Sequence, residues 1–161
     1  MELKELFYDE HLWPGYYLNV EGVLFSTRGV GLNKHNMTEE KLFYGGHMRK
    51  LKGTSCGKYI LYRLGKKYSH RDNEGRYKSV GVCSHKALME TFKPLEKNLP
   101  EDLVDEWSHL SDVVKSYIKR GMQVDHKDTN TSKPTFHHLS NLRWIIGEDN
   151  SRKGQRSYYG T

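Results

Sequence analysis

Cysteine is scarce in this chain of 161 residues, which contains only Cys56 and Cys83. The two are far apart and neither belongs to a Cys-x-x-Cys pair, which argues against a disulfide framework and against a zinc site built from cysteines. Long apolar runs are missing too, and the first residues have no signal-peptide core. We therefore expect a soluble protein in a reducing cytoplasm, with no structural zinc and no membrane partner.

Internal repeats, low-complexity tracts and obvious linkers are also absent. A chain of 161 residues with 35% hydrophobic and 29% charged residues is typical of one globular domain, or of one domain with a modest appendage. The formal charge of +6 is compatible with nucleic acid, with an anionic membrane surface, or with neither.

The charge is unevenly distributed along the chain. Residues 41–80 contain eleven Lys and Arg against two acids, whereas residues 100–112 contain five acids and no Lys or Arg. The first region therefore has the composition of an anion-binding surface, although a solvated basic surface has the same composition.

Alternating apolar and polar residues predict strands at 16–20, 23–26, 58–64 and 76–82, with weaker candidates at 42–44 and 48–51. Pro14-Gly15 and Glu21-Gly22 read as turns, and residues 1–13 as an arm or one helical turn. Basic residues on such strands would neutralise DNA phosphates and position the protein without reading sequence. The candidate DNA-binding residues are Arg49, Lys50, Lys52, Lys58, Arg63, Lys66, Lys67, Arg76, Lys78 and Arg143.

Two helices are expected after the strands. The first spans residues 84–92, and its His85 reads either as a buried structural histidine or as a site residue. The second spans residues 100–120, where apolar residues recur every three to four positions, acids begin the helix and bases end it. We expect this long helix to brace the core. The fold class predicted is α+β, with a basic β-rich region at 1–82 and a second region at 83–161.

The stretch from Gln123 to Asn150 carries the chemistry. Phosphodiester hydrolysis needs a base for the attacking water and a cation to stabilise charge on the phosphate. His126 suits the first role, while Asp125 and Asn150 supply the oxygen ligands that Mg²⁺ or Mn²⁺ prefers. Asn141 would orient His126 through a hydrogen bond from the imidazole N–H to its side-chain carbonyl. Adjacent residues of a regular strand face opposite ways, so the strand must end or bend at Asp125 and His126.

The ordered set Val-Asp125-His126-Lys-Asp128, Leu-Ser-Asn141-Leu-Arg143-Trp and Asn150 resembles the HNH nucleases with a ββα-metal core, in particular the homing endonucleases of phage introns. His85 to Phe92 is similar to the short helix that precedes that core. The stretch from Tyr16 to Ser26 is loosely similar to a motif often fused to it.

This resemblance implies His126 as general base, Asp125 and Asn150 as metal ligands, and Asn141 as the residue that orients His126. It also implies double-stranded DNA as partner and a phage gene expressed in a bacterial cytoplasm. Two other readings stay open: a DNA-binding protein with an inactive core, and an RNA-binding or RNA-cleaving β protein. The sequence leaves undecided whether the protein is a monomer or a homodimer, and what His85, His137 and His138 do.

Overall fold

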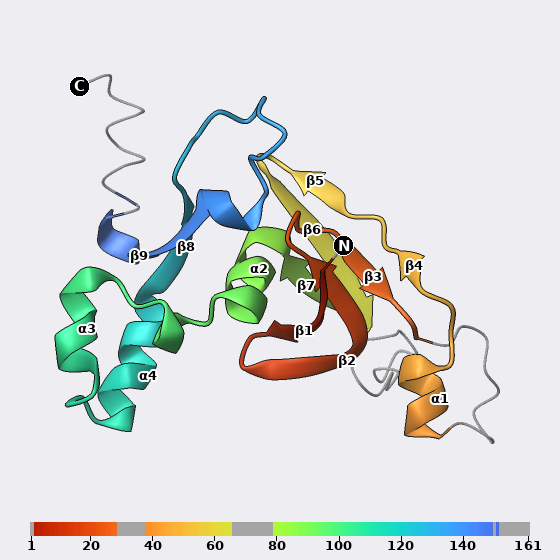
Figure 1. Cartoon of the computed structure of the whole chain (residues 1–161), viewed down its shortest axis with the longest axis horizontal. Helices are drawn as coiled ribbons and strands as arrows, with labels where there is room; N and C mark the ends of the chain where they lie inside the picture. The colour runs from red at the N-terminus through yellow and green to blue at the C-terminus, as the bar shows by residue number, and fades with distance from the viewer. Residues whose placement is uncertain (1, 29–37, 66–78, 150, 152–161) are drawn as a thin grey trace.

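The computed structural model describes residues 2–28, 38–65, 79–149 and 151, and is an α+β arrangement of antiparallel sheets and helices (Figure 1). The first sheet has four strands in the order β1 (Leu3–Tyr8), β2 (His11–Asn19), β3 (Leu24–Ser26) and β4 (Arg49–Lys50). The strand predicted at 23–26 is confirmed within one residue, and the strand predicted at 16–20 is confirmed but begins five residues earlier, at His11. The predicted arm at 1–13 is instead strand β1 and the start of β2.

The turn expected at Pro14-Gly15 lies inside β2. The hairpin turn is made by Asp9 and Glu10, which have φ of 55° and 64°. Between Glu5 and Leu6 the β1–β2 register jumps from Tyr17 to Trp13, so Pro14 and Gly15 lie in a bulge without a β1 partner. Proline has no N–H for a ladder, which is why it is accommodated at an irregularity of this kind.

The weak strand predicted at residues 42–44 is also wrong. These residues end helix α1 (Glu39–Tyr44), whose first turn is capped by Thr38: the Lys41 N–H donates to the Thr38 hydroxyl at 3.3 Å. A threonine cap four residues before Leu42, the first apolar residue of the helix, is a helix-start signal that competes with strand propensity.

The second sheet has the order β5 (Thr54–Cys56), β6 (Tyr59–Gly65) and β7 (Ser79–Cys83). Strand β6 alternates as expected, with Tyr62 and Leu64 buried in the core and Arg63 exposed. The Tyr62 hydroxyl donates to the Gly22 carbonyl, which confirms a packing role for this tyrosine. Tyr77 and the first part of the strand predicted at 76–82 lie outside the described residues.

Helix α2 (Ser84–Phe92) follows β7 directly and occupies the centre of the molecule (Figure 1). Its buried Ala87, Leu88 and Met89 belong to one hydrophobic cluster that extends from Leu6 in β1 to Leu142 in β9 (Leu142–Ile146). The core is therefore continuous across the boundary drawn at residue 82. Gly22 passes so close to α2 that the Ser84 hydroxyl donates to its carbonyl at 2.8 Å.

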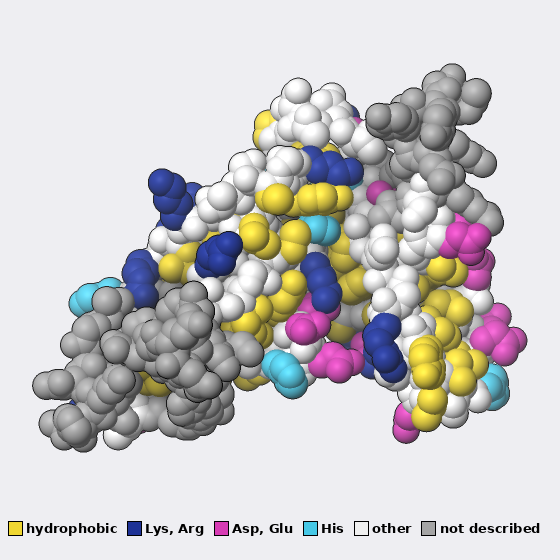
Figure 2. Space-filling model, turned by 180° about the vertical axis from the view of Figure 1, so that it is seen from behind, with side chains coloured by type: hydrophobic (Ala, Val, Ile, Leu, Met, Phe, Trp, Pro, Cys, Tyr) yellow, Lys and Arg dark blue, Asp and Glu magenta, His cyan; other side chains and the backbone are white. Residues whose placement is uncertain are grey.

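The single helix predicted at 100–120 is wrong in two respects. It is two helices, α3 (Glu101–Trp107) and α4 (Asp112–Gly121), because Ser111 caps α4 by accepting from the Val114 N–H at 3.4 Å. Neither helix has a buried residue, so the pair does not brace the core. Figure 2 shows hydrophobic side chains on their outer surface, where Val113 and Tyr117 are 65% and 66% exposed.

A two-stranded sheet closes the fold. Strand β8 (Met122–His126) pairs antiparallel with β9, and residues 147–149 and 151 after β9 are helical. Short 3-10 turns, η2 (Leu95–Lys97) and η3 (Leu139–Asn141), precede α3 and β9 respectively. In the described part of the chain, no helix is long and apolar enough to cross a membrane.

Candidate functional site

The end of strand β8 holds Asp125 and His126, opposite Arg143 and Leu142 of β9. Asp125 is 7% exposed and His126 is 2% exposed. Both faces of β8 are covered at its end, because three successive residues are buried: Val124, Asp125 and His126. The alternation of buried and exposed residues therefore stops here. The two side chains have different neighbours, Arg143 for Asp125 and aromatic rings for His126.

Asp125 contacts the guanidinium of Arg143 on the facing strand. Both Nε and Nη2 of Arg143 donate to Oδ2 of Asp125, at 3.1 and 2.9 Å. Direct cross-strand partners share a face of the sheet, which brings these two side chains together. Arg143, expected to bind DNA, therefore also compensates the charge of a buried carboxylate. Its side chain is 49% exposed, so it still borders the solvent.

His126 lies in a cluster of rings. Phe136 is stacked on it, with ring centroids 4.2 Å apart and planes 3° from parallel. His85, Tyr59 and His137 surround it at centroid distances of 5.8, 6.0 and 6.2 Å. They come from α2, from β6 and from the loop between β8 and β9, so three separate parts of the chain enclose one imidazole. We call these five residues the ring cluster.

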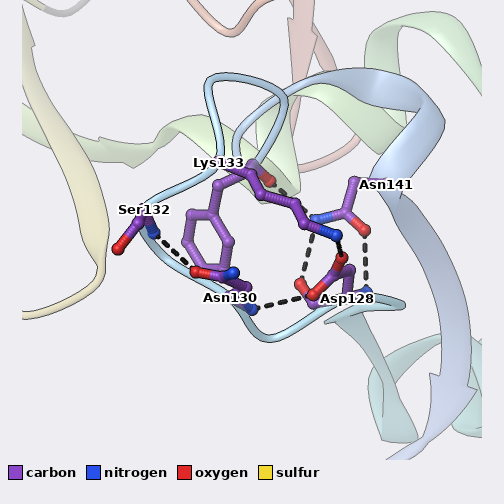
Figure 3. Close-up of polar contacts among 6 residues, drawn as sticks. Asp128, Asn130, Ser132, Lys133 and Asn141 are labelled. Atoms are coloured by element: carbon purple, nitrogen blue, oxygen red, sulfur yellow. Dashed lines mark hydrogen bonds and ion pairs between the residues drawn. The ribbon is translucent and has the colours of Figure 1, made fainter.

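Asn141 holds the backbone of the loop between β8 and β9 (Figure 3). Its side-chain carbonyl accepts from the Asp128 N–H at 2.8 Å, and its amide nitrogen donates to the carbonyls of Asp128 and Phe136 at 3.1 and 3.0 Å. Asn141 thus clamps the loop backbone, and the contact expected between its carbonyl and the His126 ring stays a prediction. Since Phe136 stacks on His126, Asn141 influences the imidazole through Phe136.

The rest of the loop is tied by short-range polar contacts (Figure 3). Asp128 accepts from the Asn130 N–H at 2.9 Å and forms an ion pair with Lys133, and Asn130 accepts from the Ser132 N–H at 3.0 Å. The hydrogen bond from Lys133 lowers the pKa of the exposed Asp128 carboxyl. These turns fix the position of the loop that carries Phe136 and His137. Turns of this kind have a sequence signature, because asparagine and aspartate side chains bond to the backbone two residues further on.

His85, whose role the sequence left open, lies on the first turn of α2. It stacks on Tyr59 at 4.4 Å and 23°, and its Nδ1 is 3.1 Å from the sulfur of Cys83. Burial, helped by the neighbouring His126, His137 and Lys58, lowers the pKa of His85 to about 4. His85 is therefore a neutral imidazole near pH 7. Burial also lowers the pKa of His137.

Asp125 is the described residue best suited to bind a divalent cation, because a carboxylate is a hard oxygen ligand. The other predicted ligand, Asn150, lies outside the described residues. Within the described ranges, no three His, Cys, Asp or Glu side chains are gathered closely enough to hold a metal ion. Mg²⁺ commonly uses one or two carboxylates and keeps several waters, so the carboxylate of Asp125 is a donor of the kind that this ion prefers.

The described basic candidates are all exposed. Arg49 and Lys50 form β4, and Lys52 follows it. Lys58 lies just before β6, Arg63 within β6 and Arg143 on β9. Lys58 lies beside the ring cluster, with its Nζ 5.3 Å from the centroid of the Tyr59 ring. Lys66, Lys67, Arg76 and Lys78 lie outside the described residues.

A cleft of about 620 Å³ lies elsewhere, between α2, α4 and β1. Its charged lining is largely self-compensated, because Lys86 pairs with Glu90 at 3.5 Å and Lys119 pairs with Glu96. None of the ring cluster lines it, so we do not assign chemistry to this cleft.

Sequence reasoning missed Tyr59, Phe136 and Cys83 as neighbours of the site. Tyr59 lies in a strand predicted only as part of the basic β-rich region, and Phe136 belongs to a loop with no periodic pattern. Only the strand alternation of β6, which puts Tyr59 on the face opposite Tyr62, could have indicated it. Comparisons of the chain with protein-family models, with curated proteins and with solved structures found no match.

Proposed function

We propose that this protein is a divalent-metal-dependent DNA endonuclease with a ββα-metal core. The observation that carries the proposal is the β8–β9 hairpin, followed by helical residues 147–149, with Asp125 and His126 at the end of its first strand. This order of elements and residues is the one that the resemblance to the HNH nucleases implies.

His126 acts in the proposed reaction as the general base. A neutral imidazole takes a proton from the attacking water, and a positioned base of this kind contributes a rate factor of roughly 10² to 10⁴. The stacked ring of Phe136, 4.2 Å away, holds the imidazole plane in place. Asn141 supports this by fixing the loop that carries Phe136.

Asp125 and Asn150 would hold the metal ion. A bound Mg²⁺ or Mn²⁺ supplies charge stabilisation for the phosphate and for the departing 3′ oxygen. Arg143 orients the Asp125 carboxylate through two hydrogen bonds to its Oδ2. Its exposed side also faces the solvent from which a phosphate would approach.

Double-stranded DNA is the proposed substrate because the exposed cations of β4, β6 and β9 border the sheet that carries Tyr59. Such cations contact phosphates and position a duplex without specifying its sequence. His85 and His137 are only partly buried, so they line the approach to the buried His126. Whether the protein cuts one DNA strand or both depends on its oligomeric state. The proposal of homing activity rests only on the resemblance of the stretch from Gln123 to Asn150 to homing endonucleases.

One observation favours a second candidate, a DNA-binding protein without activity. His126 is 2% exposed, and a base must reach water. In an inactive core, the buried imidazole and the Asp125–Arg143 pair would serve packing only. The two candidates agree on DNA binding and differ on cleavage.

The experiment is a nicking assay on supercoiled plasmid with Mg²⁺ or Mn²⁺ and an EDTA control. The endonuclease proposal expects metal-dependent nicking by the wild type, a loss of at least about 100-fold in His126→Ala, and unchanged binding to duplex DNA. Metal-dependent cleavage that survives His126→Ala refutes the mechanism. Binding without cleavage by the wild type supports the inactive core, and equal binding of duplex RNA and DNA favours an RNA partner.

A further inference from the structure

His85 has two environments, one on each side of its ring. One face is stacked on Tyr59, and the edge carrying Nδ1 contacts the sulfur of Cys83 at 3.1 Å. The ring as a whole is only partly buried and lies 5.8 Å from the ring of His126. It is therefore a neighbour of the proposed base that solvent and substrate still reach.

Cys83 determines which nitrogen of His85 carries the proton. Burial raises the pKa of the Cys83 thiol, so the S–H group is present near pH 7. The backbone N–H of His85 already lies against the sulfur as a donor, which leaves the thiol proton for Nδ1. An imidazole that accepts at Nδ1 keeps its own proton on Nε2. His85 then presents an uncharged N–H donor.

The donor lies within reach of the substrate position that His126 defines. The centroids of the His85 and His126 rings are 5.8 Å apart, so a phosphodiester that reaches His126 would also lie beside His85. Lys58 contributes positive charge nearby, since its Nζ lies 5.3 Å from the centroid of the Tyr59 ring that stacks on His85. A neutral donor beside a cation suits a phosphate oxygen and avoids a second charge in a partly buried site.

We propose that His85 is a substrate-binding residue that donates a hydrogen bond from Nε2 to a nonbridging oxygen of the scissile phosphate, with Cys83 as the positioning residue that fixes its tautomer. The inference rests on the proposed endonuclease function and deepens it. The purely structural alternative is a histidine that packs on Tyr59 and satisfies the thiol.

Two substitutions at His85 separate these roles. His85→Phe keeps a flat ring for Tyr59 and removes the donor, whereas His85→Gln loses the ring and keeps an N–H at the Nε2 position. A hydrogen bond to a charged oxygen corresponds to about a 10- to 100-fold effect on rate. The proposal therefore expects His85→Phe to lose about 10- to 100-fold in single-turnover nicking with little change in duplex binding, and His85→Gln to recover most of that loss.

Cys83 is tested in the same assay and by NMR. Cys83→Ser retains a proton donor and should nick close to the wild-type rate, whereas Cys83→Ala should lose several-fold. In long-range ¹H–¹⁵N spectra of the histidine rings, the wild type should show His85 protonated on Nε2, and Cys83→Ala should show mixed tautomers. His109→Gln, on the exposed connection between α3 and α4, is the matched control and should leave both readouts unchanged.

The outcomes separate the inference from the function beneath it. If the wild type nicks DNA and His85→Phe nicks equally well, or His85→Gln is the more damaged variant, the inference fails and the nuclease stands. If the wild type cuts no DNA, the proposed function fails. In that case the His85 Nε2–H resonance is followed during titration with a short DNA duplex in EDTA: a specific shift still supports phosphate binding, and no shift at saturation refutes it.

Discussion

Asn141 offers the sharpest test of how the site is built. Its side chain makes three hydrogen bonds with the backbone of the loop between β8 and β9, at 2.8, 3.1 and 3.0 Å (Figure 3). Each such bond contributes about 0.5–1.5 kcal/mol net, so Asn141→Ala should lower the free energy of unfolding by about 2–4 kcal/mol. That is a large fraction of the roughly 5–15 kcal/mol of an ordinary domain.

Asn141→Asp distinguishes the loop clamp from direct orientation of His126. The aspartate retains an oxygen that could accept from an imidazole N–H, so a direct contact predicts a mild effect. The structure predicts a severe one, because a carboxylate oxygen would then face the carbonyls of Asp128 and Phe136. We therefore expect Asn141→Asp to be at least as destabilised as Asn141→Ala, and the nicking rate to fall in both.

The assay is urea unfolding followed by tryptophan fluorescence, with the slope compared between variants to exclude a change in the denatured state. Asn130→Ala is the matched control in the same loop, because it removes one exposed hydrogen bond, from the Ser132 N–H, and should change stability by about 0.5 kcal/mol. A loss below about 1 kcal/mol in Asn141→Ala, or wild-type stability in Asn141→Asp, refutes the clamp.

Three further predictions concern the scaffold. Burial lowers the pKa of His85 from 6.5 to about 4, so the unfolded chain takes up a proton more readily than the folded protein. The contribution of His85 to stability is therefore complete above about pH 6.5 and is lost as the pH falls to about 4. The free energy of urea unfolding should differ between these two pH values by about 3 kcal/mol less in His85→Phe than in the wild type. Tyr117→Ser should change the free energy of unfolding by less than about 0.5 kcal/mol, because the Tyr117 ring is 66% exposed. Leu88→Ala in the core should lower the free energy of unfolding by about 2–5 kcal/mol. Similar losses in the two variants would mean that α4 packs against the core. Gly22→Ala should lower the thermal midpoint of unfolding much more than Gly57→Ala. Both glycines have positive φ, but a Cβ at Gly22 would lie 2.4 Å from the Ser84 hydroxyl oxygen, whereas a Cβ at Gly57 would meet no atom within 4 Å. Equal losses in the two variants would assign the effect to backbone strain alone.

The α3–α4 pair shows the limit of a periodic pattern. Apolar residues every three to four positions predicted one long buried helix, and the helical residues are largely where they were expected. The pattern does not tell whether another part of the protein covers the apolar face of the helix. In the structure, Val113 and Tyr117 on that face are exposed. Ser111 is a cap signal within the pattern, and its local hydrogen bond divides the helix.

The sequence by itself determined the α+β class, the strands with strict alternation, and the neighbourhood of Asp125, His126 and Asn141, because these depend on local periodicity and on short spacings across one hairpin. Only the tertiary structure decided what surrounds His126. Phe136 reaches it from a loop, Tyr59 from β6 and His85 from α2. These contacts join residues far apart in the chain, and they arise from packing α2 against all three sheets, which no local pattern specifies.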